Sequence, residues 1–368
     1  MKYQELDTPC LLIDREIMLG NLRFMQDWAD SQKVALRPHT KTHKMPYIAR
    51  LQKKMGAVGI AVAKVGEAEV MAANGLDDIF IANEIVGEKK LERIRKVAEI
   101  STIAFGVDSP CQVEEAERVF ASAAKPANVL IEIEVGENRS GVIEEKDYLD
   151  LLETIRRCSH VHFRGIFSHD GHSYSAKDTE ECGRIFLESQ RRTLRFAELA
   201  EAKGMKPEVV SIGSTPSLMN RFEILEGITE LRPGTYVFMD ASQAHAIGTL
   251  DRCAATVLAT VISRPTAERV IMDVGAKGLT MQERTKGICA TPGKGTIREY
   301  PSVHIFAVYD EHAIIYDREF RENVRIGEKL RIIPVHICPV CNLYDSAFLI
   351  SGDDVVEEIP VLCRGKLQ

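Results

Sequence analysis

Several features are missing from this sequence of 368 residues, and each absence narrows its class. No apolar run approaches the roughly 20 residues that a membrane-spanning helix needs. The first residues, Met1 to Asp7, contain no apolar core of the signal-peptide type, so we expect a cytoplasmic protein. The net charge of −7 is mild, which argues against nucleic acid or an anionic membrane as the main partner.

The sequence also lacks a disulfide pattern, a nucleotide-binding glycine motif and an interdomain linker. The nine cysteines are odd in number and scattered, which makes a poor disulfide framework and fits free or metal-bound thiols in a reducing compartment. No Gly-x-Gly-x-x-Gly follows the first expected strand, which lowers the case for a nucleotide-binding open sheet. No linker rich in proline, glycine or serine separates two halves of the chain, so any domain boundary is soft.

Short apolar runs alternate with helical patterns through the first two thirds of the chain. Apolar residues recur at helical spacing in residues 14–29, 147–158 and 179–203. Repeated strand-then-helix units predict a parallel sheet, and seven or eight of them predict a closed barrel, although periodicity alone also allows an open, doubly wound sheet. The runs that we expect to form strands are 34–36, 59–62, 78–82, 103–107, 129–134, 163–167 and 209–213.

The pattern changes after about residue 240. The later apolar runs are β-rich and have little helix between them, which suggests a separate all-β domain. We therefore predict a TIM-type (β/α)8 barrel over residues 11–240, followed by a C-terminal all-β domain over residues 241–368, which the N-terminal segment 1–10 joins. The runs concerned are 254–262, 269–274, 303–308, 312–316 and 329–334.

A cluster of cations directly follows the first expected strand. Lys41 lies there among Arg37, His39, His43 and Lys44. A lysine among other cations loses part of its ammonium character, and the freed amine is a nucleophile toward aldehydes. The alternative is a solvated basic loop, since runs of charge usually mark an exposed face.

The segment Arg37-Pro38-His39-Thr40-Lys41-Thr42-His43-Lys44 resembles the cofactor-lysine signature of the D-threonine aldolase and D-serine dehydratase family. The resemblance extends from Asp7-Thr8-Pro9 to His336-Ile337-Cys338 and so covers essentially the whole chain. It implies an alanine racemase-like barrel of pyridoxal phosphate (PLP) fold type III, with Lys41 as the Schiff-base lysine and catalytic base.

Polar residues follow several of the expected strands, where a barrel builds its active site. After one late strand, Gly213-Ser214-Thr215 leads into an expected helix, and its amides and hydroxyls could hold a phosphate. An ordinary helix N-cap is the alternative for this tripeptide. The family resemblance favours the phosphate loop, and it implies Tyr236, in the segment 231–236, as a further phosphate contact.

Three more residues acquire cofactor roles through the resemblance. Arg139 would face the phenolate oxygen of the cofactor with a charge-assisted hydrogen bond; without the resemblance it is a surface arginine in a turn. His169 would lie against the pyridine face, where it is also a candidate catalytic residue. Tyr174 would meet the pyridine nitrogen and leave it unprotonated, which makes the ring a weaker electron sink.

The segment from His336 to Asn342 contains an imidazole and two thiols. If it is extended, His336 and Cys338 project to the same side and can bind one ion, and thiolate with imidazole favours zinc. A redox pair of Cys338 with Cys341, half of a structural zinc site, and a buried histidine with inert cysteines are alternatives. The resemblance implies that His336-x-Cys338 is the metal pair of the dehydratases, whereas aldolases more typically have aspartate at the second position. Cys341 has no assigned role.

Taken together, the residues and the resemblance predict a lyase that uses PLP and zinc, or another divalent metal, on small D-3-hydroxy amino acids. The expected reaction is that of a D-serine or D-3-hydroxyaspartate dehydratase, which releases ammonia and a 2-oxo acid. The main alternative is D-threonine aldolase-type cleavage to glycine and an aldehyde. An amino acid racemase and a non-catalytic PLP carrier are further alternatives. We also expect a homodimer, by resemblance, and no nucleic-acid or membrane partner.

Overall fold

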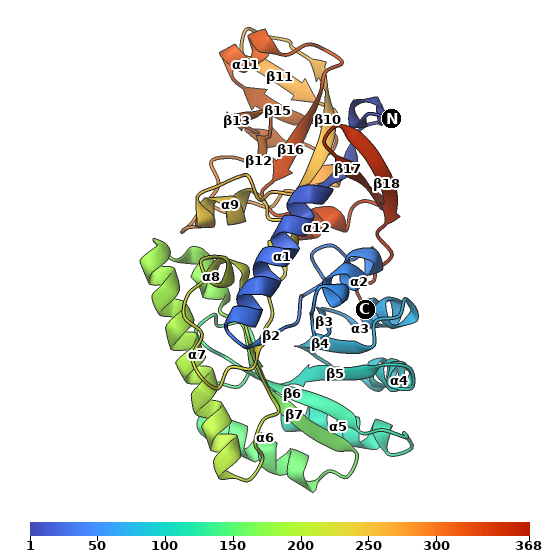
Figure 1. Ribbon diagram of the computed structural model, residues 1–368, viewed down its shortest axis with the longest axis vertical. Coiled ribbons are helices and arrows are strands. Elements are labelled where there is room, and N and C mark those ends of the chain that lie inside the picture. The colour runs from blue at the N-terminus through green and yellow to red at the C-terminus, as the bar shows by residue number, and fades with distance from the viewer. The chain divides into compact units, whose positions relative to one another are not determined.

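A computed structural model describes all residues, Met1–Gln368, and is drawn in Figure 1. The chain forms two compact units, which are described separately. The first consists of Met1–Phe24, Thr42–Met45 and Thr235–Arg364, and the second of Met25–Lys41, Pro46–Gly234 and Gly365–Gln368. No helix is both long enough and apolar enough to cross a membrane.

The second unit is a barrel of eight parallel strands in the order β2-β9-β8-β7-β6-β5-β4-β3. An isolated parallel bridge between His39 and Ala61 joins the continuation of β2 to β3 and closes the ring of strands. The strands are β2 (Ala35–Leu36), β3 (Ile60–Val62), β4 (Asp78–Glu84), β5 (Thr102–Val107), β6 (Ala127–Ile133), β7 (Val161–Ser168), β8 (Val209–Ile212) and β9 (Glu230–Leu231).

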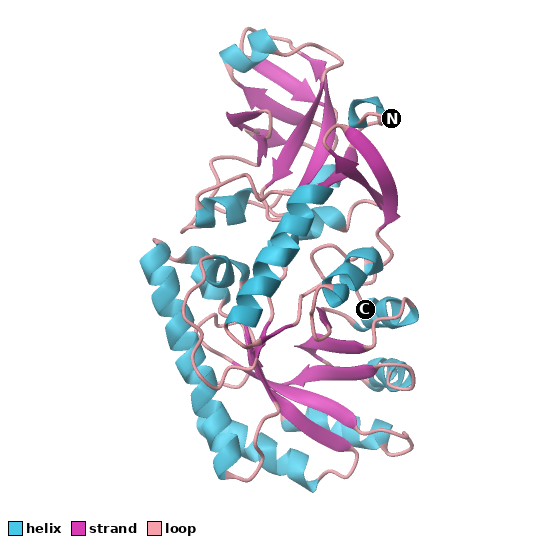
Figure 2. Ribbon diagram, viewed as in Figure 1, coloured by secondary structure: helices cyan, strands magenta, loops and turns pink.

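A helix follows each of the first seven barrel strands, so the chain repeats the strand–helix unit as expected (Figure 2). A layer of apolar side chains, one from each of five adjacent strands, fills the barrel interior: Ala61, Phe80, Ala104, Leu130 and Phe167. The helices are α2 (Pro46–Lys54), α3 (Val65–Ala73), α4 (Glu88–Val97), α5 (Pro110–Phe120), α6 (Glu145–Arg157), α7 (Thr179–Ala202) and α8 (Thr215–Met219), with the 3₁₀ helix η2 (Gly171–Ser175) after β7.

The first unit contains a ten-stranded, mostly antiparallel sheet in which β10 pairs with β1, β11 and β16. Strand β1 also pairs with β17 in the parallel direction. Its strands are β1 (Cys10–Asp14), β10 (Ala255–Ser263), β11 (Arg269–Met272), β12 (Gly295–Ile297), β13 (Tyr300–His304), β14 (Ala307–Val308), β15 (Ala313–Tyr316), β16 (Lys329–Pro334), β17 (Ser346–Ser351) and β18 (Asp354–Pro360).

Short helices connect the strands of this first unit: η1 (Tyr3–Glu5), η3 (Thr235–Val237), α9 (Ala241–Ile247), α10 (Ala276–Leu279), α11 (Arg318–Asn323) and α12 (Ile337–Cys341). Helix α1 (Arg15–Ser31) contributes residues to both units. Its apolar residues at helical spacing are buried, as the periodicity predicted; they include Met18, Met25 and Trp28. The predicted fold class, a parallel (β/α)8 barrel with an all-β domain, is confirmed. The boundary at residues 240 and 241 stays a prediction.

Candidate active site

Lys41 follows the strand segment that closes the barrel. The backbone amide and the hydroxyl of Thr40 both donate to the Ala61 carbonyl oxygen, at 2.8 and 3.0 Å. The Lys41 amide then donates to Nδ1 of His39 at 3.4 Å. These contacts fix the backbone on the N-terminal side of Lys41, so the lysine is held at the end of a strand rather than in a loose loop.

The ring of His39 is buried among cationic groups. Burial lowers its pKa well below the ordinary value, and the nearby charges of Lys41, Arg232, His169 and Arg139 act in the same direction. His39 is therefore neutral at pH 7. The same interactions show that three predicted site residues, Lys41, Arg139 and His169, gather around one imidazole. Sequence reasoning gave His39 no role, although it is two positions from the predicted cofactor lysine.

Arg139 lies between two carboxylates in the loop after β6. One guanidinium nitrogen is 3.3 Å from Oε1 of Glu132, and the other is 3.4 Å from Oε2 of Glu137. Glu137 also contacts Nδ1 of His169, at 2.9 Å. A single network thus joins the predicted phenolate contact to the predicted pyridine-face residue.

His169 and Tyr174 lie close to each other with nearly parallel rings. Their ring centroids are 6.4 Å apart and the planes differ by 23°. Burial lowers the pKa of His169, although the hydrogen bond to Glu137 opposes the shift. The 3₁₀ helix η2 carries Tyr174, so the structure places both residues in the segment that follows β7.

The turn Gly213-Ser214-Thr215 connects β8 to α8. Gly213 has a φ of +139°, and a Cβ atom there would lie 2.9 Å from a Leu218 side-chain carbon and 3.1 Å from the Arg232 amide nitrogen, so only glycine fits. Ser214 is the N-cap residue of α8. The turn therefore has the close-packed form in which backbone amides can approach a phosphate.

The Ser214 hydroxyl is engaged by buried polar groups. It donates to Oδ2 of Asp170 at 2.9 Å and lies 3.1 Å from the Ser173 hydroxyl. Ser217 donates to the same Asp170 oxygen at 2.5 Å, whereas the other oxygen, Oδ1, is buried without a hydrogen-bond partner. Ser214 can therefore offer a phosphate its backbone amide, while its hydroxyl is directed to Asp170.

Tyr236 and the predicted metal pair belong to the first unit. Tyr236 is in η3 and is 1% exposed. Nδ1 of His336 lies 2.9 Å from the amide oxygen of Gln282. If Nδ1 donates this hydrogen bond, the lone pair of the neutral ring is on Nε2, which is how protein histidines are prepared for metal binding. Cys338 lies 3.2 Å from the Thr42 hydroxyl, and Thr42 directly follows Lys41 in the chain.

The prediction that the metal pair lies in an extended segment is wrong for Cys338. His336 has extended dihedral angles, but it is the N-cap of helix α12, and Cys338 is in that helix. The helix begins there because Oδ2 of Asp240 accepts the Ile337 amide at 3.1 Å. Cys341 is fully buried, and burial raises the pKa of its thiol well above the ordinary value.

No cluster of three or more His, Cys, Asp or Glu side chains in the chain has metal-binding geometry. A metal at His336 and Cys338 would therefore have two protein ligands from this chain. The chemistry of an imidazole and a thiol fits zinc.

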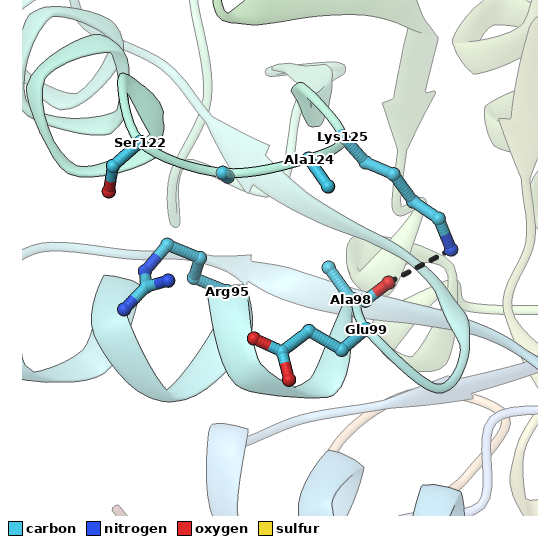
Figure 3. Close-up of a pocket in the computed structure, with 7 residues that line it drawn as sticks. Arg95, Ala98, Glu99, Ser122, Ala124 and Lys125 are labelled. Carbon is cyan, nitrogen blue, oxygen red and sulfur yellow. Dashed lines mark hydrogen bonds between the residues drawn. The ribbon is translucent and has the colours of Figure 1, made fainter.

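A cavity of about 360 Å³ lies elsewhere on the barrel unit (Figure 3). It is lined by residues from the end of α4 and from the loop after α5, including Arg95, Glu99 and Lys125, and Lys125 donates to the Ala98 carbonyl oxygen at 3.0 Å. These segments precede β5 and β6, so the cavity is at the N-terminal ends of these strands. None of the predicted site residues lines it.

The barrel has a lysine after its first strand and a glycine turn before a late short helix, as expected for a PLP enzyme with the alanine racemase fold. The family model described as the alanine racemase N-terminal domain matches residues 13–242, and that of the putative serine dehydratase domain matches residues 254–350. The chain belongs to the family of PLP-dependent D-amino acid aldolases and dehydratases and is therefore a lyase, as predicted.

Relatives of both reaction types resemble the chain. A D-threonine aldolase of Arthrobacter sp. is 34% identical over 96% of this chain and 91% of its own. A D-threo-3-hydroxyaspartate dehydratase of Delftia sp. strain HT23 is 30% identical over 96% of both chains. The crystal structure of a D-threonine aldolase from Filomicrobium marinum has 29% identity, covers 100% of this chain and 98% of its own, and has a TM-score of 0.90.

Two further solved structures concern D-threo-3-hydroxyaspartate dehydratase variants. Each has 26% identity and covers 98% of this chain, with TM-scores of 0.91 and 0.90 and 96% and 98% of their own chains covered. In one a histidine is replaced by alanine, and in the other a cysteine is replaced by alanine and the structure is described as the metal-free form. The two replaced residues are two positions apart, as His336 and Cys338 are here.

Proposed function

We propose that the protein dehydrates small D-3-hydroxy amino acids such as D-serine, D-threonine or D-3-hydroxyaspartate, giving ammonia and a 2-oxo acid. The observation that carries this proposal is the cysteine at position 338, two residues after His336. The same spacing separates the two residues replaced in the dehydratase variants, of which the cysteine variant is described as metal-free.

The cofactor would be bound by residues of the barrel. Lys41 would carry its aldehyde carbon, the amides of the turn at Gly213 would hold its phosphate, and Arg139 would donate to its phenolate oxygen. Bound there, PLP supplies an electron sink for the charge that develops at the substrate α-carbon. The amine of Lys41 would remove the α-proton, and neutral His39 beside it adds no positive charge that would oppose Lys41 on taking up that proton.

The metal ligands in the proposal are His336 and Cys338. Zinc bound by these two side chains would supply a Lewis acid that helps a hydroxyl group to leave. Gln282 would orient His336 through its contact with Nδ1. Tyr236, from η3, would add a phosphate contact, and Tyr174 would meet the pyridine nitrogen.

The test is product analysis with D-threonine and the zinc-loaded holoenzyme. Dehydration gives 2-oxobutyrate and ammonia in equal amounts, and a chelator abolishes their formation until zinc is restored. Glycine with acetaldehyde would contradict the proposal. Lys41→Ala should lose both the activity and the covalent lysine–cofactor adduct that borohydride traps. Lys54→Ala, at an exposed position, should keep both.

Retro-aldol cleavage is the second candidate, because the Arthrobacter relative at 34% identity is a D-threonine aldolase. In that reaction the substrate hydroxyl is deprotonated and the Cα–Cβ bond breaks, so the α-proton is not removed. Deuterium at the α-carbon of D-threonine distinguishes the two. Dehydration should show a primary isotope effect on product formation, and retro-aldol cleavage should show none.

The substrate class and assembly in this proposal follow the family resemblance. We propose a cytoplasmic homodimer, and sedimentation velocity should give twice the chain mass of 41.1 kDa. A species at the mass of one chain would contradict the dimer.

A further inference from the structure

Two helices of the first unit begin at one carboxylate. Asp240 is the N-cap residue of α9, and its Oδ1 accepts the Gln243 amide and the Ser242 hydroxyl, both at 2.9 Å. Its other oxygen, Oδ2, accepts the amide of Ile337, the first residue of α12, at 3.1 Å. An aspartate at an N-cap ordinarily serves only the helix that follows it. The contact with Ile337 is therefore an additional one, made to a segment almost 100 residues further along the chain.

Hydrogen bonds to the start of α9 hold the backbone on both sides of His336. Before it, the Val335 carbonyl oxygen accepts the Ser242 amide at 3.3 Å. After it, the Ile337 amide donates to Asp240. A restraint on one side would leave the residue free to rotate about its backbone bonds, whereas the two together fix its φ of −142° and ψ of 110°. They also fix the direction in which the imidazole leaves the backbone.

The start of α12 is capped without the His336 ring. An N-cap residue commonly accepts a helix amide with its own side chain. His336 is the N-cap of α12, but its side chain makes no such hydrogen bond, and its Nδ1 contacts Gln282 instead. Asp240 supplies the acceptor for the first amide of the helix. The imidazole can therefore be directed to a metal while α12 is still capped, with Cys338 as the second residue of the helix.

The contacts of Asp240 make it a rigid support. Asp240 is 0% exposed, and an ionised carboxylate is stable in the interior only when donors surround it. Two amides and one hydroxyl fill this role. Ile337 is also 0% exposed, so a movement of α12 away from Asp240 would leave a buried amide without its acceptor. The start of α12 is thus held in one place relative to α9.

We propose that Asp240 is a positioning residue, which fixes His336 and Cys338 in the arrangement that binds the metal. The inference rests on the proposed function, since the metal roles of these two residues come from there. The two ligands flank Ile337, so its hydrogen bond with Asp240 restrains both of them. A pair that is restrained beforehand loses less conformational entropy when the metal binds, and it therefore binds the metal more tightly.

The first experiment measures the zinc affinity of the full chain without added cofactor, by competition with a chromophoric chelator. In Asp240→Asn the remaining side-chain oxygen can still cap α9, because asparagine is as good an N-cap as aspartate. Its amide group then faces the Ile337 amide, and two donors cannot form a hydrogen bond. The dissociation constant of zinc should rise by about 10- to 100-fold. An unchanged constant would overturn the proposal.

Asp317 offers a matched control in the same unit. It is the N-cap residue of α11 and accepts the Phe320 amide at 2.8 Å, but it does not contact the segment of the metal pair. Asp317→Asn should keep the wild-type zinc affinity. Asp317→Ala should lower the midpoint of thermal unfolding and still keep that affinity. If Asp317→Ala weakened zinc binding as much as Asp240→Asn does, the effect would be a general loss of stability, and the proposal would be wrong.

A second experiment uses the wild-type protein and does not depend on how well Asp240→Asn folds. Zinc at the pair should slow hydrogen exchange at Ile337 and, through Asp240, at the Gln243 amide, by at least about threefold. The Phe320 amide, which Asp317 accepts, should exchange at the same rate with and without zinc. A Gln243 rate that zinc leaves unchanged would overturn the positioning role. Failure of the wild type to bind zinc at all would contradict the metal pair of the proposed function, and this inference with it.

Discussion

Asp170 accepts the hydroxyl of Ser217 at 2.5 Å, and the same carboxylate oxygen accepts the hydroxyl of Ser214 at 2.9 Å. An aspartate thus braces both ends of the first turn of α8, directly after the glycine turn that is the candidate phosphate site. The Ser214 hydroxyl is therefore directed to Asp170, and we infer that this carboxylate supports the turn through both serines.

This relationship predicts that two substitutions, at Asp170 and at Ser214, have unequal effects on cofactor affinity. Asp170→Ala should raise the dissociation constant of PLP at least about tenfold, because the buried serines lose their acceptor and the turn relaxes. Ser214→Ala removes a hydroxyl that already donates to Asp170 and should change the constant by less than about threefold. Equilibrium dialysis measures both, and equal effects would show that the hydroxyl itself binds the phosphate.

Gln282 is predicted to control metal affinity without touching the metal. Its amide oxygen lies 2.9 Å from Nδ1 of His336 and fixes the orientation of the ring. Gln282→Ala should weaken zinc binding by about 10- to 100-fold, as losses of outer hydrogen bonds to metal ligands do. Competition with a chromophoric chelator measures the affinity. Exposed Gln32→Ala is the matched control, and an unchanged affinity in Gln282→Ala would contradict the orienting role given to Gln282.

Glu230 is predicted to be essential for the stability of the barrel. It accepts from Arg37 at 2.6 Å, and both side chains are 4% exposed. Burial opposes the charge on Arg37, but Glu230 and Asp78 raise the pKa of this guanidinium above its ordinary value. Glu230→Ala leaves part of a buried charge uncompensated and should lower the free energy of unfolding by about 3–5 kcal/mol in urea titration. Asp150→Ala, which breaks an exposed pair with Lys146, should leave the midpoint unchanged.

Because His39 is buried in its neutral form, we predict that the protein loses stability in acid. Its pKa in the native protein is below that in the unfolded chain, so the unfolded chain takes up a proton that the native ring does not. The contribution of His39 to the free energy of unfolding is fully present above the ordinary histidine pKa of about 6.5. It declines as pH falls below that value. Thermal unfolding between pH 5 and pH 8 should show a shallower acid decline in His39→Gln than in wild type. His312→Gln, at an exposed position, should decline like wild type.

Elements with strong periodicity were predictable from the sequence. The helical pattern over residues 179–203 corresponds to α7, Thr179–Ala202, and the apolar run at 129–134 corresponds to β6, Ala127–Ile133. The last barrel strand, β9, was not predicted, because Glu230–Leu231 is only two residues long and contains a buried charge, so no apolar run marks it. Helix α12 was missed because the carboxylate that accepts its first amide belongs to Asp240, which is far away in the sequence.

The hydrogen-bond and ion-pair partners of the site residues also could not be predicted from the sequence. Lys41 was identified from its motif, and Arg139 and His169 through the family resemblance. The contacts of Glu132 and Glu137 with Arg139 were not predicted. The one local signal was Glu132 itself, a charge within an otherwise apolar strand. A carboxylate in such a strand must find donors, but its sequence position does not say which ones.

Beside Lys41, where the barrel closes, strands β2 and β3 are joined more weakly than the other neighbouring strands. Strands β6 and β7 share seven register pairs, whereas β2 and β3 are joined by the single bridge of His39 with Ala61 and the hydrogen bonds around it. In hydrogen exchange, the amides of Thr40 and Ala61 should open before those of β6. If the cofactor binds Lys41 as proposed, the covalent bond would form directly beside the contacts that close the barrel. Cofactor binding would then stabilise the closed ring of strands at its least connected point.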